Sequence, residues 1–448
     1  MFGWFKPSCP VGTWEKAWIE VQFAALVELV GLPRLLAVEM LLPTREYFPD
    51  ALTPPPHDAN TFLANVRNYL QLDVGDVGLR ILDEERQVWD ATREDVLWDE
   101  PVVRIAQSAL HDAEALVSAI ACELSRIYLA QRGVYSERDA DALWAAELLA
   151  VVLGAGVFVA NAAIVEEPVD STSLWRSSQM RRRGYLPARM VGYALALFAW
   201  AREERPTWST YLRLDAASAA RDGWRYLRST RDSLFTPGLA SVASAERPID
   251  ALLNDLARGT PARRLAALWS IGEQAESASS AHDAVIAGAG DDDVAVRDEA
   301  LRVLTVLGVQ SSAAEEAVLR GLRDESESVR ATAAHAAASL FPESSALIEE
   351  LSFLLEDESG EVTCGAALAL GRYGRRAAPH LDRMLNTLKR GIVTCHEPIT
   401  AAACGALLAI AADPTLCICQ RFGEDPEMLD TAIRELRKYG PSDEPAID

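Results

Sequence analysis

The sequence has few of the residues that build metal sites or disulfides. It contains 7 cysteines and 6 histidines among 448 residues. Cys417 and Cys419 are separated by one residue, but no second cysteine pair stands at the spacing of a zinc ribbon. No histidine lies four positions from another histidine or from a cysteine. These absences argue against a structural zinc site and a disulfide framework, so we expect no cofactor and a reducing, cytoplasmic location.

Basic residues are also in short supply. The formal net charge is −23, and most of it lies from Ile249 onward. Contacts with phosphate need clustered lysine and arginine, so we expect neither nucleic-acid binding nor attachment to an anionic membrane. The glycines at Gly154 and Gly156 lie in an apolar run without a following Lys-Ser/Thr, which excludes a phosphate loop. The N-terminus shows no basic stretch followed by an apolar run, so no signal peptide is expected.

One uncharged apolar run invites comparison with a membrane span. It extends from Leu148 to Ile164, is slightly shorter than a span requires, and includes two glycines. We interpret it, together with the shorter run 191–201, as buried helices of a globular domain. Membrane contact is the alternative interpretation.

What the sequence does have is a repeat. Val296-Arg297 recurs as Val329-Arg330 and then as Val362-Thr363, in steps of 33 residues. Each copy follows an acidic turn and continues into an alanine-rich helical pattern. Such a unit cannot bury its apolar stripe alone, so neighbouring units must stack. The pattern resembles HEAT-like repeats over about residues 249–414. The resemblance implies an α-solenoid whose concave face binds a protein partner.

Three arginines recur at corresponding places in these repeats: Arg263, Arg297 and Arg330. One interpretation is an internal ladder, in which each arginine binds the adjacent acidic turn. The other is a row of partner-binding residues that grip an acidic protein. We favour the ladder, because stacking is the first requirement of a periodic polar residue in a solenoid.

The first part of the chain mixes helical and strand patterns. Helices are predicted over 14–30, from the cap Asp58 to Leu70, and over 111–131. Alternating residues predict short strands near 77–81 and 102–105, and residues 34–43 also have β-like character. We therefore predict a domain over 1–228, a linker over 229–248, a solenoid over 249–440 and a disordered tail over 441–448.

The predicted helix 111–131 carries the residues closest to a catalytic motif. Its segment Cys122-Glu123-Leu-Ser-Arg126 stands in the frame His-Glu-x-x-His of a zincin metallopeptidase, and Glu147 stands where an acidic third ligand would lie. The wider frame is similar to that of a family of uncharacterised bacterial proteins over about residues 14–228. The matching stretches are Leu42-Pro-Thr-Arg-Glu-Tyr-Phe-Pro-Asp50, Gly154-Ala-Gly-Val-Phe-Val-Ala-Asn161, Gly184-Tyr-Leu186 and Gly192-Tyr-Ala-Leu-Ala196.

Both histidines of that motif are missing here. A guanidinium remains protonated and cannot ligate zinc, so Arg126 cannot replace an imidazole. Cys122 and Glu147 alone fall short of the three protein ligands of a catalytic zinc site. We expect Arg126 instead to supply the missing positive charge and to pair with Glu123 and Glu147. The alternative is that Arg126 points to solvent.

The sequence thus predicts a mainly α protein, with an N-terminal α+β zincin-like domain and a C-terminal HEAT-like α-solenoid. The favoured function is a non-catalytic, protein-binding scaffold with no metal and no catalytic residues. The alternative is a metal-dependent hydrolase that uses Glu123 as general base, with Cys122 and Glu147 as partial ligands. The two differ in whether the protein holds zinc.

Overall fold

The chain forms two compact units, Met1–Glu246 and Arg247–Asp448. The computed structural model describes residues 7–49, 54–82, 100–136, 139–168, 178–182, 184–235 and 247–439. The predicted tail 441–448 lies outside these residues, as does the part of the predicted linker from 236 to 246. The start of that linker belongs to the first unit, because the chain remains packed as far as the buried Phe235.

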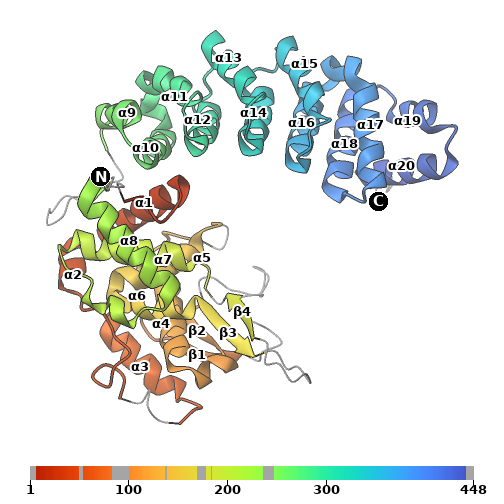
Figure 1. The fold of residues 1–448 in the computed structure, drawn as a ribbon. Coiled ribbons are helices and arrows are strands. Elements are labelled where there is room, and N and C mark those ends of the chain that lie inside the picture. The colour runs from red at the N-terminus through yellow and green to blue at the C-terminus, as the bar shows by residue number, and fades with distance from the viewer. Residues whose placement is uncertain are drawn as a thin grey trace, which may run out of the picture. The chain divides into compact units, whose positions relative to one another are not determined.

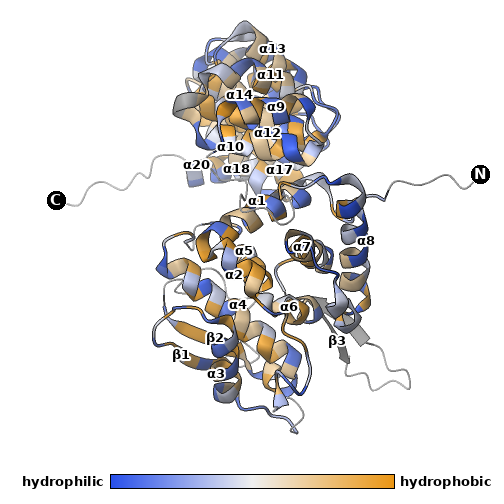
Figure 2. Ribbon diagram, turned by 90° about the vertical axis from the view of Figure 1, so that its left-hand side faces the viewer, coloured by the Kyte–Doolittle hydropathy of each residue, from blue (hydrophilic) through white to orange (hydrophobic). Residues whose placement is uncertain are grey.

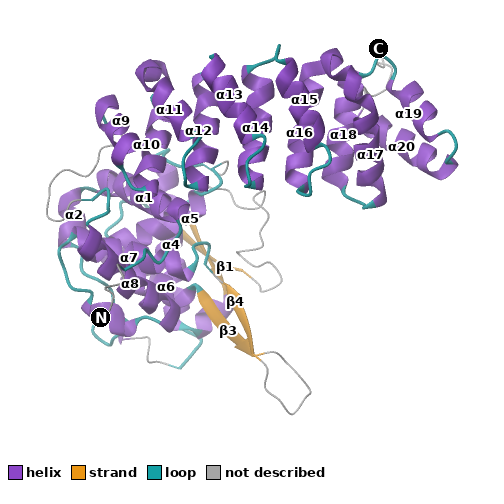
Figure 3. Cartoon of the chain, turned by 45° about the horizontal axis from the view of Figure 1, so that its top comes forward, coloured by secondary structure: helices purple, strands orange, loops and turns teal. Residues whose placement is uncertain are grey.

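The first unit is mainly helical. Its helices are α1 (Thr13–Val30), α2 (Leu32–Ala37), α3 (Ala59–Leu70), α4 (Ala113–Gln131), α5 (Ala142–Ala150), α6 (Gly156–Ala162), α7 (Ala188–Ala201) and α8 (Leu214–Thr230). Strand β1 (Gly78–Leu82) pairs in parallel with β2 (Val102–Ala106), and β3 (Ile164–Pro168) pairs antiparallel with β4 (Ser178–Arg182). Within the described residues, Figure 3 shows strands only in this unit. The two short strands predicted near 77–81 and 102–105 are confirmed as β1 and β2.

Local sequence signals explain where several of these helices begin. Asp58 caps α3 by accepting hydrogen bonds from the amides of Asn60 and Thr61. Asp112 caps α4 in the same way. The β-like character predicted for 34–43 is wrong in its first part, which forms α2. Pro33 lies in the first turn of that helix, where its missing N–H costs no hydrogen bond.

The long apolar run forms the centre of the first unit. The continuous helical segment Ala142–Ala162 is long and apolar enough to cross a membrane, yet 89% of its most apolar window is buried inside this unit. The helices α18 (Glu397–Ile410) and α19 (Pro414–Phe422) pass the same test only if taken together across a 119° bend. In Figure 2, hydrophobic residues dominate α5 and α6, whereas α8 shows a hydrophilic side. The run therefore serves as core in this structure, as a buried helix would.

A π-helical turn, Val151–Ala155, interrupts the central helix between α5 and α6. Gly154 in this turn has φ 88°, a left-handed conformation that favours glycine. Its carbonyl accepts a hydrogen bond from the amide of Leu41 at 2.9 Å. A Cβ at this position would lie 2.3 Å from the carbonyl oxygen of Glu39. The turn thus allows the segment after α2 to lie directly on the central helix.

The second unit is built entirely from helical repeats in its described residues. The first helices of the successive repeats are α9 (Ile249–Arg258), α11 (His282–Gly288), α13 (Ser312–Gly321), α15 (Ser345–Leu354), α17 (Leu381–Val393) and α19. The second helices are α10 (Pro261–Glu273), α12 (Val294–Leu307), α14 (Glu327–Leu340), α16 (Gly360–Tyr373), α18 and α20 (Pro426–Tyr439). Figure 1 shows the two sets as two rows.

Contacts between successive repeats pass mainly through the second helices. The pairs α12–α14, α14–α16 and α16–α18 pack directly on one another, whereas successive first helices make far fewer contacts. Buried alanines, among them Ala300, Ala333 and Ala366, allow this close approach. Closer spacing on one side of a stack curves it toward that side. We call the solvent-exposed side of the second helices the inner face.

Candidate functional site

The four residues of the degenerate motif come together in the first unit. Cys122, Glu123 and Arg126 lie on α4, and Glu147 lies on α5, which packs against α4. Helix α4 also packs against β2. The site therefore lies where one helix meets a strand on one side and a second helix on the other.

Arg126 is buried and paired with Glu123. The side chain of Arg126 is 1% exposed, and its Nε and Nη2 donate to the two carboxylate oxygens of Glu123 at 3.1 Å. The pair joins residues three positions apart, which share one face of the helix. The expected ion pair between these two residues is present, and the alternative of a solvent-exposed Arg126 is wrong.

The same pair occupies one edge of strand β2. Arg126 Nη2 donates to the main-chain oxygen of Val102 at 2.9 Å, and Glu123 Oε2 accepts the main-chain amide of Arg104 at 3.1 Å. The oxygen of Val102 and the amide of Arg104 point to the same side of the strand, away from β1, which is bound through Pro101. The side chains of Arg126 and Glu123 thus make the two hydrogen bonds that a neighbouring strand would make, and they block this edge of β2 from pairing with another strand.

Glu147 is held by a different set of donors. Its carboxylate is 3% exposed and accepts the main-chain amides of Tyr185 at 2.8 Å and Leu186 at 2.7 Å. We expected Arg126 to bind both carboxylates, but the structure gives Glu147 these two main-chain donors. Two amides aimed at one carboxylate stabilise its charge without a metal. The sequence had pointed to Gly184-Tyr185-Leu186 only as part of a family pattern.

The thiol of Cys122 and the phenol of Tyr185 complete the cluster. Burial raises the pKa of the Cys122 thiol well above its ordinary value, and the charges of Glu147 and Glu123 raise it further. Burial and the same two carboxylates also raise the pKa of Tyr185. Both groups therefore stay protonated at neutral pH, and a protonated thiol is a poor nucleophile and a poor metal ligand.

A pocket of about 40 Å³ lies beside these residues. Its polar lining comes from Arg104, Ser108, Ser118 and Glu147, and small apolar side chains supply the rest. This volume has room for a few water molecules and no more. Within the described ranges, no group of three or more histidine, cysteine, aspartate or glutamate residues is arranged to hold a metal.

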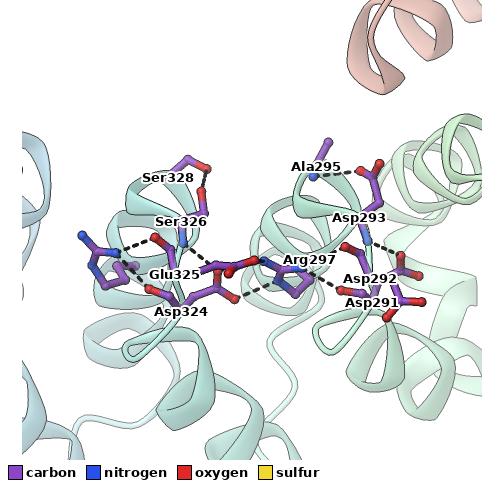
Figure 4. Close-up of polar contacts among 10 residues, drawn as sticks. Asp291, Asp292, Asp293, Ala295, Arg297, Asp324, Glu325, Ser326 and Ser328 are labelled. Carbon is purple, nitrogen blue, oxygen red and sulfur yellow. Dashed lines mark hydrogen bonds and ion pairs between the residues drawn. The ribbon is translucent and has the colours of Figure 1, made fainter. Parts of the chain in front are cut away.

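The second set of predicted residues, in the solenoid, forms a ladder between repeats. Arg297 binds both oxygens of Asp324 at 2.8 and 2.9 Å, and Arg330 binds both oxygens of Asp357 at 2.9 and 3.0 Å. Each pair spans 27 residues and joins a second helix to the acidic turn of the next repeat. Figure 4 shows Arg297 between the turn of its own repeat and that of the next.

Each turn aspartate also organises its own turn. Asp324 accepts the amide of Ser326 at 2.9 Å, and Asp357 accepts that of Ser359 at 2.8 Å. Burial tends to raise the pKa of both carboxyls, but the arginine and main-chain hydrogen bonds outweigh it, so each pKa falls below its ordinary value. Arg297 and Arg330 thus link neighbouring repeats, as the ladder interpretation predicts, and their role in binding an acidic partner stays a prediction.

The predicted register is wrong by one residue in the first repeat. Arg264, one residue after the predicted Arg263, makes the ladder contact, with Asp291 Oδ1 at 2.7 Å and again across 27 residues. Counting 33 residues back from Arg297 leads to Arg264, but the two adjacent arginines and the looser pattern around Pro261 suggested Arg263. The 33-residue step was visible in the sequence, and an alignment of the repeats on that length alone would have identified Arg264.

Comparisons with known proteins identify part of the solenoid. Residues 315–408 match the family described as HEAT repeats, so this stretch consists of HEAT repeats. No curated protein matches the chain. Among solved structures, one described as "Kap95p Binding Induces the Switch Loops of RanGDP to adopt the GTP-bound Conformation" contains a chain with 12% identity and a TM-score of 0.33. The match covers 73% of this chain and 50% of that one, and at this TM-score we draw no conclusion from it.

Proposed function

We propose that this protein is a non-catalytic scaffold whose HEAT-repeat solenoid binds a protein partner on its inner face. The observation that carries the proposal is the repeat stretch 315–408, because stacked repeats present an extended surface and have no catalytic centre of their own. We further propose that the first unit is an inactivated metallopeptidase-like domain in a cytoplasmic protein. All seven cysteines lie within the described residues and are free thiols, which suits a reducing compartment.

The geometry of the first unit favours an inert site over a hydrolase. A general base needs a carboxylate that can take a proton from water, whereas both oxygens of Glu123 already accept hydrogen bonds from Arg126 and one also binds Arg104. Both oxygens of Glu147 are likewise engaged. The arrangement stabilises the fold at the place where a metallopeptidase would do its chemistry.

Two measurements test the two halves of this proposal. For the first unit, we expect purified full-length protein to hold no stoichiometric transition metal and its melting temperature to be unchanged by a chelator. A peptide-hydrolysis signal that disappears in Glu123→Gln would contradict the inert site.

For the solenoid, a photo-crosslinking amino acid replaces Leu368 of the inner face or, as a control, Phe353 on the outer helix α15. The two side chains are 55% and 49% exposed. We expect a cross-linked protein, identified by mass spectrometry, from position 368 only. Equal labelling at both positions would contradict binding on the inner face.

A further inference from the structure

We infer that the inner face of α14, α16 and α18 binds an amphipathic helix of a protein partner whose apolar side is bordered by lysine or arginine. This inference rests on the proposed scaffold function and adds the chemistry of the partner. It depends on three features of this face: an apolar centre, an acidic border, and the internal use of the nearby arginines.

The exposed stripe of each of these second helices begins with a glutamate followed by a small residue, and the three stripes differ from one another beyond these two positions. Positions three or four apart share one face of a helix, so each stripe can be followed from the first turn to the last. The stripes are Glu327, Ala331, His335 and Ser339 on α14; Glu361, Gly365, Leu368 and Arg372 on α16; and Glu397, Ala401, Gly405 and Ala409 on α18. All twelve residues are exposed or half-buried. Because the three helices pack side by side, the glutamates form one border, and Ala331, Gly365 and Ala401 form a band of small residues beside it.

Beside this band, the middle helix α16 carries one large apolar side chain. Leu368 is 55% exposed, and its counterpart on the next helix is Gly405. A Cβ at Gly405 would have no atom within 4 Å, so open space lies above that helix beside Leu368. An apolar side chain of a partner can occupy this space and remove Leu368 from water. The counterpart of Leu368 on α14 is His335, so the open space lies on the α18 side, where Gly405 lets a partner helix approach closely.

The charge at the border favours a basic partner. Glu327, Glu361 and Glu397 are exposed, and so is Glu325 in the adjacent turn, at 87%. The arginines of this edge, Arg297 and Arg330, are held by the turn aspartates through two hydrogen bonds each. The ladder therefore engages the two arginines closest to this border. Arg372, the basic residue of the three stripes, lies at the opposite end from the glutamates, so the exposed glutamates set the sign of the border. A row of lysines or arginines complements it.

The dimensions fit a short helix. Neighbouring helices pack about 10 Å apart, so three of them span roughly 20 Å. A helix of about 14 residues has this length at 1.5 Å per residue. Such a segment can lie across all three stripes, with its apolar side on Leu368 and its basic residues toward the three glutamates.

The test uses two labelled 18-residue peptides with the same apolar helical pattern. One carries lysine and the other glutamate at every polar position, and fluorescence anisotropy measures binding to the full-length protein. The inner-face variants are Leu368→Ser and the triple variant Glu327→Gln/Glu361→Gln/Glu397→Gln. The matched outer-face controls are Phe353→Ser and Glu316→Gln/Glu349→Gln/Asp382→Asn, because these residues are exposed on first helices and the triple control changes the net charge by the same amount.

Both peptides use leucine at the apolar positions. We expect the peptide with lysine at its polar positions to bind the unchanged protein and the peptide with glutamate there not to bind. Each inner-face variant should weaken binding at least tenfold, and each outer-face control less than twofold. Equal losses from inner and outer variants would show non-specific attraction to an acidic protein and would overturn the inference. So would binding of the glutamate peptide, or a dimer of the protein that is lost in Leu368→Ser. If position 368 cross-links a partner while the lysine peptide fails to bind, the scaffold function stands and the basic partner is rejected.

Discussion

Arg390 donates a hydrogen bond of 2.7 Å to the hydroxyl of Thr363, across the same 27 residues that separate each arginine from its aspartate elsewhere in the ladder. In the other contacts the arginine donor precedes its acceptor in the chain, whereas here the arginine follows the acceptor. Arg390 also binds the main-chain oxygens of Leu355 at 3.0 Å and Asp357 at 3.3 Å. In the preceding repeats the corresponding turn carbonyls are bound by Arg297 and Arg330. The guanidinium at this turn is therefore retained, but it comes from the following repeat.

The ladder should contribute measurably to the stability of the solenoid. Replacing Arg330 by Met removes two charge-assisted hydrogen bonds to Asp357 and leaves a half-buried carboxylate, so we expect a loss of about 2 kcal/mol. Hydrogen exchange of the full-length protein should show faster exchange in α14 and α16. The control is Arg320→Met, since Arg320 is 54% exposed and pairs only at the surface; we expect less than about 0.5 kcal/mol there. Similar effects in both variants would argue against a special role for the ladder.

The same contacts predict a sensitivity to acid. The pKa values of Asp324 and Asp357 are lowered below their ordinary 3.8 in the folded chain. Their stabilising contribution is therefore complete above pH 3.8 and disappears as the pH falls through the lower folded values. We expect the denaturation midpoint of the protein to fall over this range. In Asp324→Asn/Asp357→Asn, stability should be lower at neutral pH but should change less with acid. An unchanged acid slope in this variant would assign the sensitivity to other groups.

The buried pair in the first unit should be coupled strongly. Arg126→Met leaves Glu123 with only the more distant guanidinium of Arg104, whose Nη1 lies 3.9 Å from Oε2, and we expect destabilisation by about 3–5 kcal/mol. Adding Glu123→Gln should recover part of this loss, because the remaining charge is removed as well. Arg225→Met is the matched control: it disrupts a pair with Asp222 that has the same spacing but is largely exposed. Thermal unfolding of the unchanged protein, Arg126→Met, Glu123→Gln and the double variant measures the coupling. If the losses of the two single variants simply add up to that of the double variant, the coupling is contradicted.

Restoring the two histidines tests the proposed ancestry of the site. In Cys122→His/Arg126→His, two imidazoles four residues apart would stand on α4 with Glu147 nearby. We expect the purified variant to retain about one zinc ion per chain after dialysis, as measured by elemental analysis. Cys122→His/Arg126→Gln lacks the second imidazole and should retain far less. A folded double-histidine variant without zinc would count against a metallopeptidase-like frame.

The turn at Gly154 should not tolerate a side chain. Alanine there would place Cβ against the carbonyl of Glu39 and would keep a left-handed φ, so we expect a loss of more than about 2 kcal/mol. Gly75 is a suitable control, because it also has a positive φ but would meet no atom within 4 Å. Gly75→Ala should therefore cost only about 1 kcal/mol. Equal melting temperatures of the two variants would mean that residues 38–41 can move away from the central helix.

The sequence predicted features that arise from regular spacing. The 33-residue step located the repeats, the alternating residues located β1 and β2, and the Asp58 cap located the start of α3. It did not reveal α2, where a proline in a first helical turn outweighed a short apolar run. Nor did it reveal the true first rung of the ladder, because two neighbouring arginines made the register ambiguous.

The site shows a similar limit. The motif pointed to Arg126 and Glu123 as partners, since both the charge and the spacing were visible in the sequence. The donors of Glu147 were not visible, because they are main-chain amides of a segment almost 40 residues away, and any residue supplies an amide. The use of Val102 and Arg104 by the ion pair depends in the same way on backbone atoms of a distant strand. Contacts of this kind become known only when the chain is folded.

The replacement of an arginine–aspartate contact by the contact between Thr363 and Arg390 has a mechanical consequence. The contacts of Arg297 with Asp324 and of Arg330 with Asp357 each consist of two hydrogen bonds to a carboxylate. In the next repeat, Arg390 on α17 instead binds the hydroxyl of Thr363 on α16 and main-chain oxygens of the preceding turn. Neutral acceptors resist pulling less than charged ones do. When the array is stretched or bent, we therefore expect this polar contact to break before the contacts at Asp324 and Asp357.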